Sequence, residues 1–315
     1  MIAIAEIEAA RGRIAGAAVR TPLVRLPLED AGTEIWCKLE TLQPIGSFKI
    51  RGAANAVRSA DPALVARGLV TASAGNMAQG VAWIARELGV PATIAVPDHA
   101  PAAKLDAIAR LGGTALKLPY ADWWACIEHN RVEGAEGFFV HPVSDPAVMA
   151  GNGTIGLELL EDLEDIDAVV IPYGGGGLTS GIASALRARS PQTRIFTAEP
   201  EGGAAAAAAW EAGEPVALDY QPSFIDGSGS RRVLDAMWPI VRELIDGALV
   251  TSVAETAAAL RLLAERLHVI AEGAGALAPA AALAGRAGAG RIVAIVSGGN
   301  IDLSVVARIL KGETP

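Results

Sequence analysis

The sequence is poor in the residues that several large classes of protein require. Its two cysteines, Cys37 and Cys126, are too few for a disulfide framework and lack the spacing of metal ligands. Its 26 lysines and arginines are outnumbered by 35 aspartates and glutamates, and the net charge of −9 argues against a nucleic-acid groove, which needs a basic face. No stretch of about 18 consecutive apolar residues lacks glycine, proline or charge. We therefore expect no nucleic-acid or membrane partner and a reducing, cytoplasmic environment.

The arrangements of histidine and serine that mark common hydrolases are also missing. The four histidines are scattered, and we interpret each as a structural or surface residue. No Gly-x-Ser-x-Gly elbow and no Ser-His-Asp order is present. Residues 1–18 have an amphipathic helical pattern with charged side chains, which is not that of a signal peptide.

What the chain has instead is length, apolar residues and alternating strand-like and helix-like segments. With 315 residues, 51% of them hydrophobic, it can build one large α/β unit or two domains. The alternation predicts parallel strands joined by crossover helices, an α/β fold. Strands are predicted at residues 34–39, 69–72, 92–96, 114–118, 137–140, 168–171, 194–198 and 291–296. Helices are predicted at residues 2–17, 48–59, 76–88, 102–111, 121–133, 147–160, 178–189, 204–209 and 256–267.

We expect two domains without tandem repeats. Residues 1–70 together with 148–315 would form a large domain, and residues 71–147 would form a smaller inserted domain. Residues 221–232, rich in glycine and serine, are typical of a long loop.

The stretch KLETLQPIGSFKIRGA, residues 38–53, leads from a strand-like segment into a predicted helix. It places Lys49 in the first turn of that helix, where the helix dipole disfavours an ammonium group. Burial would lower the pKa of this lysine further, and a neutral lysine amine is the usual partner of an aldehyde cofactor in a Schiff base. Taken singly, most lysines at helix starts are surface residues.

Glycine-bearing turns recur after predicted strands, where ligands bind in parallel sheets. In Thr71–Gly80, free amides and the side chains of Ser73 and Asn76 suit a carboxylate, although either residue could be an ordinary N-cap. The four glycines Gly174–Gly177 leave successive amides free to surround a phosphate at a helix N-terminus. A tight flexible turn is the alternative, and a dinucleotide site is disfavoured because the Gly-x-Gly-x-x-Gly pattern is absent.

Two further glycine turns carry a polar side chain. Ser297-Gly298-Gly299-Asn300 follows a predicted strand, and the hydroxyl of Ser297 could hydrogen-bond a ring nitrogen. The segment 272–276 places the carboxylate of Glu272 before a helix of small residues, where it could equally be an ordinary acidic first turn.

Taken in order, Gly-Ser-Phe-Lys, Ser-x-Gly-Asn, four glycines and Ser-Gly-Gly-Asn resemble the fold-type II pyridoxal-phosphate enzymes, specifically the branch of threonine/serine dehydratases and serine racemase. The resemblance runs from Thr21 to Ser297, and residues 38–53 are its most specific part. It implies a two-domain, tryptophan synthase β-like fold of parallel-rich sheets flanked by helices, with pyridoxal 5'-phosphate as the cofactor.

The resemblance also implies roles for individual residues. Lys49 would be the catalytic residue, binding the cofactor aldehyde and acting as the base at the substrate Cα. The implied cofactor-binding residues are Phe48, Lys49, Asn76, Gly174, Gly175, Gly176, Gly177 and Ser297. The implied substrate-binding residues are Ser73, Ala74, Gly75, Asn76 and Met77.

Two positions depart from the family pattern Ser-Ser-Gly-Asn-His. Ala74 replaces the second serine, which acts as acid and base in racemases, so efficient racemisation is disfavoured. Met77 replaces the histidine, which favours a substrate larger or more apolar than serine. After Glu199 the acidic residue that would help bind a metal is missing, and we expect no metal there.

The resemblance therefore predicts an ammonia-lyase that converts a β-hydroxy amino acid, a small-molecule substrate, to a 2-oxo acid and ammonia by α,β-elimination. The alternatives are an amino-acid racemase, a β-replacement enzyme, a dehydratase for a compatible-solute degradation intermediate, and a non-catalytic relative that binds the cofactor or an amino acid. We expect a homodimer, the commonest soluble oligomer.

Overall fold

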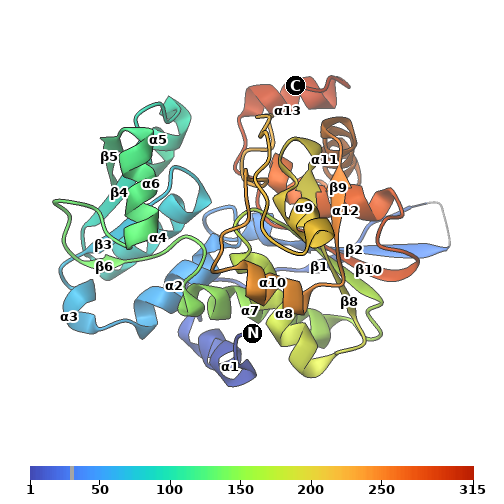
Figure 1. Cartoon of the computed structure of the whole chain (residues 1–315), viewed down its shortest axis with the longest axis horizontal. Coiled ribbons are helices and arrows are strands. Elements are labelled where there is room, and N and C mark those ends of the chain that lie inside the picture. The colour runs from blue at the N-terminus through green and yellow to red at the C-terminus, as the bar shows by residue number, and fades with distance from the viewer. Residues whose placement is uncertain (29–31) are drawn as a thin grey trace.

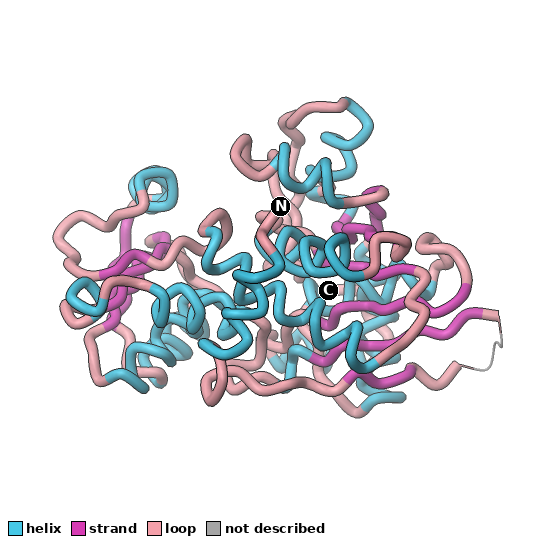
Figure 2. The backbone as a smooth tube through the Cα atoms, turned by 90° about the horizontal axis from the view of Figure 1, so that it is seen from below, coloured by secondary structure: helices cyan, strands magenta, loops and turns pink. Residues whose placement is uncertain are grey.

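A computed structural model, which describes residues 1–28 and 32–315, contains two separate sheets, each covered by helices (Figure 1). The smaller sheet lies in the left-hand lobe of Figure 1, and the larger sheet lies in the right-hand lobe together with both chain termini. Seen from below, the strands again fall into two groups with helices between them (Figure 2). The predicted α/β class is confirmed.

The larger sheet has six strands in the order β1-β2-β10-β7-β8-β9. These strands are β1 (Leu23–Arg25), β2 (Thr33–Leu39), β10 (Gly290–Val296), β7 (Ala168–Pro172), β8 (Arg194–Pro200) and β9 (Gly247–Thr251). Only β1 is antiparallel to its neighbour, and the others are parallel. Strands from the two ends of the sequence, β2 and β10, pair in register over their full seven residues. Their carboxyl ends therefore reach the same edge of the sheet.

The smaller sheet has four parallel strands in the order β5-β4-β3-β6. These are β5 (Thr114–Leu118), β4 (Ala92–Pro97), β3 (Leu69–Ala72) and β6 (Phe138–Phe139). Short helices connect them, namely α4 (Asn76–Leu88), α5 (Ala102–Arg110) and α6 (Tyr120–His129). The division into domains 1–70 plus 148–315 and 71–147 stays a prediction.

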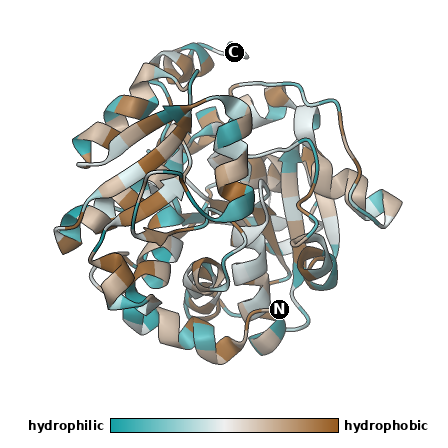
Figure 3. Cartoon of the chain, turned by 60° about the vertical axis from the view of Figure 1, so that its left-hand side comes forward, coloured by the Kyte–Doolittle hydropathy of each residue, from teal (hydrophilic) through white to brown (hydrophobic). Residues whose placement is uncertain are grey.

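Helices cover both faces of the larger sheet. One face packs on a core that includes α11 (Val253–Leu267), α12 (Gly273–Leu283) and α13 (Leu303–Leu310). The other face packs on α7 (Pro146–Asp162), α8 (Gly177–Arg189), α9 (Ala205–Ala212) and α10 (Trp238–Leu244). Helix α1 (Ile4–Arg13) packs on α7, and α3 (Pro62–Val65) is a single turn. The outer helices carry both hydrophobic and hydrophilic residues, as their position between core and solvent requires (Figure 3).

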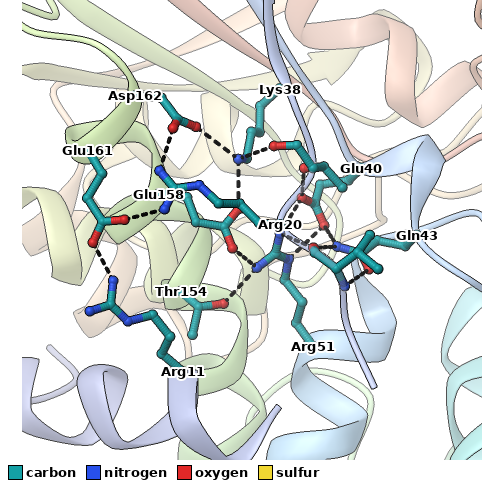
Figure 4. Close-up of polar contacts among 12 residues, drawn as sticks. Arg11, Arg20, Lys38, Glu40, Gln43, Arg51, Thr154, Glu158, Glu161 and Asp162 are labelled. Carbon is teal, nitrogen blue, oxygen red and sulfur yellow. Dashed lines mark hydrogen bonds and ion pairs between the residues drawn. The ribbon is translucent and has the colours of Figure 1, made fainter. Parts of the chain in front are cut away.

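Helix α2 (Lys49–Ser59) connects the two lobes, since it packs on α7 on one side and on α4 on the other. Arg51 in its first turn is fully buried and ion-paired with Glu40 at 2.8 Å and with Glu158 of α7 at 2.6 Å. Lys38, also fully buried, joins the same network through Glu158 at 2.7 Å (Figure 4). Burial alone would raise the pKa of Glu40, but Arg51 beside it holds that pKa below its ordinary value. The network therefore fixes the start of α2 against β2 and α7.

The agreement between predicted and observed elements varies and does not increase with the length of the predicted segment. The spans 69–72, 76–88 and 114–118 are correct to the residue. Two predicted helices are too long. The helix predicted at residues 2–17 is α1, which covers only Ile4–Arg13. The helix predicted at residues 121–133 is α6, which ends at His129, four residues before the predicted end. Strands β1 and β9 and helix α10 were not predicted. Both strands lie at sheet edges, where pairing with a neighbour decides whether a short segment is extended.

Cys37 and Cys126 are both free and buried, in agreement with the interpretation that they form no disulfide. Over residues 1–28 and 32–315, no helix is both long and apolar enough to cross a membrane.

Candidate active site

One pocket of about 420 Å³ is bordered by every residue predicted for the site. These residues are Phe48, Lys49, Ser73, Ala74, Gly75, Asn76, Met77, Gly174, Gly175, Gly176, Gly177 and Ser297. They follow strands β3, β7 and β10 or begin helix α2, so the pocket lies where the carboxyl ends of both sheets meet. A depression of about 540 Å³ elsewhere is lined by α1, α7 and the end of α8 and contains none of the predicted residues.

Lys49 is the first residue of α2 and points into this pocket. Its Nζ donates a hydrogen bond to the carbonyl oxygen of Pro142 at 2.8 Å and lies 5.2 Å from the centre of the Phe48 ring. Burial lowers the pKa of Lys49 to about 8, although the nearby carboxylate of Glu272 acts in the opposite direction. The amine is therefore roughly half neutral at pH 8, whereas an ordinary lysine would be neutral in only about 0.3% of molecules.

The turn that contains Pro142 is organised by a histidine. The Nδ1 atom of His141 accepts hydrogen bonds from the amides of Val143 at 3.0 Å and Ser144 at 2.8 Å. Burial lowers the pKa of His141, which favours the neutral imidazole that these two bonds require. The interpretation of this histidine as structural agrees with these contacts, and its function is to hold the carbonyl that receives Lys49.

The Ser73–Met77 turn ends β3 and begins α4. Gly75 occupies the N-cap position, and neither Ser73 nor Asn76 caps the helix with its side chain. Ser73 Oγ instead accepts a hydrogen bond from the amide of Gly75 at 3.2 Å. The side chain of Asn76 is held from two sides, donating to Glu272 Oε1 at 2.7 Å and accepting from Asn300 at 2.7 Å.

Glu272 belongs to the site, although the sequence did not place it there. We expected the glycine turn 272–276 to follow a strand, but residues 268–272 join α11 to α12, and Glu272 is the N-cap residue of α12. The carboxyl group is 5% exposed, and burial, with a contribution from Asp226, raises its pKa to about 8. Glu272 and Asn76 are 196 residues apart in sequence, so only the folded chain shows that they are neighbours.

The glycine turn Gly174–Gly177 connects β7 to α8. In the described parts of the chain, none of its four amides donates a hydrogen bond to another backbone or side-chain group. A side chain is excluded at two of these positions, because a Cβ on Gly175 would lie 2.5 Å from Val143 Cγ2 and one on Gly177 would lie 2.6 Å from the Val143 carbonyl oxygen. At Gly176 the backbone φ of +94° also favours glycine. The turn thus presents free amides at the N-terminus of a 13-residue helix, an arrangement that binds anions.

Ser297 follows β10 and lies beside the start of α2. Its carbonyl oxygen accepts a hydrogen bond from the amide of Phe48 at 3.0 Å, and Ser47 pairs with Gly298 in an isolated β-bridge. The side chain of Ser297 is almost fully buried at the edge of the pocket.

Other residues of the pocket could not be inferred from local sequence. The loop 226–230 borders it, as do Lys104, Trp123, Trp124 and Ile127 from α5 and α6. In the sequence, the glycine and serine content of residues 221–232 predicts a loop but no site. The helical pattern of residues 121–133 predicts a helix but no site. Both segments become part of the site through the meeting of the two lobes.

The fold and the pocket are typical of one class of protein. The comparison with known families identifies this class. Residues 14–298 match the family of pyridoxal-phosphate dependent enzymes, and the chain belongs to this family. Together with the relatives described next, this match confirms the resemblance to the fold-type II dehydratase and racemase branch.

Individual relatives extend over almost the whole chain. The chain is 38% identical over 316 residues to L-threonine ammonia-lyase from Thermotoga maritima, covering 98% of this chain and 78% of that protein. It is 37% identical over 314 residues to serine racemase from Oryza sativa, covering 96% of this chain and 92% of that protein. The solved structure of maize serine racemase is similar with a TM-score of 0.88 and 34% identity, covering 99% of this chain and 97% of the other.

The residues present fit the family's cofactor. A buried amine of lowered pKa, a turn of four free amides and a buried serine hydroxyl border one pocket, and they match the aldehyde, the phosphate and the ring nitrogen of pyridoxal phosphate. Lys49, Gly174–Gly177 and Ser297 are the groups that would hold it.

Proposed function

We propose that the protein is an ammonia-lyase that converts a β-hydroxy amino acid, such as threonine or serine, to a 2-oxo acid and ammonia. The observation that carries the proposal is Lys49, whose amine lies beside the glycine turn and the Ser73–Met77 turn with a pKa lowered to about 8. The similarity to threonine ammonia-lyases over nearly the whole chain supports it.

Pyridoxal phosphate, when bound, supplies an aldehyde that captures amines and a conjugated ring that withdraws electrons from the substrate Cα. The amides of Gly174–Gly177 and the dipole of α8 bind the phosphate. The Ser73–Met77 turn and the N-terminus of α4 bind the substrate carboxylate, which orients the Cα–H bond toward Lys49.

Lys49 then acts as the general base, and its neutral amine accepts the proton from Cα. The Cα proton and the β hydroxyl leave as water, and a second water later replaces the amino group. The sum of these steps is one 2-oxo acid and one ammonia for each amino acid. Ser297 would accept or donate a hydrogen bond at the ring nitrogen without adding a charge.

Elimination is favoured over racemisation because of Ala74. Racemisation needs a proton donor on the face of Cα opposite Lys49, and Ala74 offers only a methyl group in the turn where the racemases of this family carry a serine. Because serine racemases are among the relatives, racemisation is the alternative activity to measure.

The test is the release of 2-oxo acid and ammonia in a 1:1 ratio by the purified holoenzyme with L-threonine, L-serine and other β-hydroxy amino acids. Lys49→Ala should lower kcat/KM by about 10²- to 10⁴-fold, the usual contribution of a general base. Lys117→Ala, at an exposed position on β5, is the matched control and should retain full activity.

Borohydride reduction should attach the cofactor to the peptide that contains Lys49. Full turnover by Lys49→Ala would exclude the mechanism, and loss of optical purity without 2-oxo acid would favour a racemase.

We also propose a homodimer, since two-fold dimers are the commonest soluble oligomers, and a cytoplasmic location. We propose that no metal binds near Glu199. Its two carboxylate oxygens accept hydrogen bonds from the amides of Ala206 and Ala207 at 2.9 Å each, so this side chain is engaged in capping α9.

A further inference from the structure

The pocket has two chemically different walls. The wall toward the larger sheet carries the polar groups of Lys49, the glycine turn, Glu272 and Ser297 beside apolar residues such as Phe48, Leu178 and Leu234. Beyond the Ser73–Asn76 turn, the wall contributed by residues 71–147 is mainly apolar, with the side chains of Met77, Pro97, Trp123, Trp124, Ile127 and Val143. The substrate carboxylate and amino group are bound by the polar groups, so the substrate side chain is the part left to meet the apolar wall.

Helix α6, in the left-hand lobe of Figure 1, supplies three of these six side chains. Trp123, Trp124 and Ile127 lie within five residues of one another on this helix and all border the pocket. The Trp123 indole N–H donates to the carbonyl oxygen of Ala95 at 3.2 Å, and that of Trp124 donates to Glu128 Oε1 at 2.8 Å. Both indole donors therefore have protein partners, and the rings present carbon surface to a ligand.

The aromatic rings are also held in place by one another. The ring of Trp123 lies 5.5 Å from that of Tyr120 and 6.1 Å from that of Trp124. Met77, at the beginning of α4, borders the pocket, is 1% exposed and packs into the hydrophobic core of the smaller lobe. Preorganised rings suit a large apolar group better than a hydroxymethyl group.

The charged side chain on this wall already has an ion-pair partner. Among the described residues of 71–147 that border the pocket, Lys104 is the only charged side chain, and its Nζ lies 2.5 Å from Asp226 Oδ2. A strongly polar substrate side chain would lose water against indole carbon. An apolar substituent does not have this cost.

We propose that this wall selects β-hydroxy amino acids whose β-carbon carries a bulky apolar substituent, aryl or branched alkyl, in preference to serine. The inference rests on the proposed elimination and specifies the substrate class for the same site. L-threo-3-phenylserine is the probe substrate, and its expected products are the corresponding 2-oxo acid and ammonia.

The first arm of the test measures binding without elimination. L-Phenylalanine and L-alanine have no leaving group on the β-carbon, and their dissociation constants can be measured with the holoenzyme from cofactor absorbance and tryptophan fluorescence. We expect L-phenylalanine to bind at least about tenfold more tightly, as differential burial of an apolar group requires. Equal affinities for the two amino acids would overturn the inference.

The second arm compares kcat/KM for L-threo-3-phenylserine and L-serine in the wild type and in variants. We expect the ratio to favour phenylserine at least about tenfold and to fall by about tenfold in Trp124→Ala. Trp210→Ala, at an exposed position on α9, is the matched control and should leave the ratio unchanged. If thermal unfolding shows that Trp124→Ala is not folded, Ile127→Ala takes its place. A preference for serine that is the same in all variants would overturn the inference.

The two arms separate this inference from the proposed function. Binding of L-phenylalanine at least about tenfold tighter than L-alanine, with no 2-oxo acid from any substrate, would reject elimination and still support the apolar side-chain site. Release of 2-oxo acid from serine and phenylserine with equal efficiency would support elimination and reject the apolar selectivity.

Discussion

At the scale of single residues, Lys49 and Glu272 border one pocket and influence each other through their charges. The Glu272 carboxylate raises the pKa of Lys49 against the stronger effect of burial. Glu272→Gln should therefore lower the pKa of Lys49 below about 8 and shift the pH profile of pyridoxal-phosphate incorporation into the apoprotein to lower pH, by up to about one unit. Absorbance of the bound cofactor, followed between pH 6 and 10, measures this profile.

The same substitution has a second signature in stability. The pKa of Glu272 is raised from 4.5 to about 8, so the folded apoprotein binds this proton more tightly than the unfolded chain does. The contribution of Glu272 to the free energy of unfolding is therefore fully present below pH 4.5 and is lost as the pH rises to about 8. Glu272→Gln should remove this decline, whereas Glu243→Gln, at an exposed position on α10, should keep it. A decline of equal size in both variants would show that Glu272 does not titrate in this range.

Individual residues also show where sequence reasoning reaches its limit. Lys49, Gly174–Gly177 and Ser297 border one pocket, and each lies in a local pattern from which a role could be proposed; the roles themselves stay predictions. Glu272 could not be assigned, because its function depends on Asn76, which reaches it only after both lobes have folded. From the sequence alone, Trp123 and Trp124 indicate only that they belong to a helix. The folded chain shows that both also border the pocket.

At the scale of elements, the position of Lys49 depends on how firmly helix α2 is anchored. Arg51, two residues further along, donates five hydrogen bonds to Glu40, Glu158 and Thr154 in the buried network of Figure 4. Arg51→Met would leave the carboxylates of Glu40 and Glu158 without this partner and should lower the free energy of unfolding by about 3–5 kcal/mol. Urea denaturation of the apoprotein measures this loss.

The matched control is Arg20, which is drawn in the same figure. Arg20 is ion-paired with Glu161 and Asp162, but its side chain is 49% exposed. Arg20→Met should therefore cost no more than about 1 kcal/mol. Similar losses in the two variants would mean that burial of the Arg51 network does not determine its strength.

Elements differ in how far local sequence determines them. The predicted spans of strand β3 and helix α4 are correct to the residue, because Gly68 directly precedes the strand and Gly89 ends the helix as a left-handed C-cap. Strand β9 is only partly buried along four of its five residues and gave too weak a pattern. It is extended because β8 offers it a parallel partner, which no local signal reveals.

At the scale of the whole molecule, the pocket is completed by two lobes that meet through few charged contacts. Lys104 on α5 and Asp226 in the loop 221–232 form an ion pair of 2.5 Å across the pocket. Their side chains are 37% and 55% exposed, so the pair contributes no more than about 1 kcal/mol to stability and is weakened by salt. A contact of this strength can hold the lobes together over a ligand and still open for product release.

We expect L-phenylalanine to slow amide hydrogen exchange in the holoenzyme over residues 102–129 and 221–232, because both segments border the pocket from opposite lobes. Lys104→Ala, or 1 M salt with the wild type, should reduce this added protection without unfolding the protein. Lys117→Ala, on β5 away from the pocket lining, should behave as the wild type does. Exchange that L-phenylalanine leaves unchanged in both segments would contradict closure of the lobes, and the selectivity of the pocket would then have to arise from a rigid site.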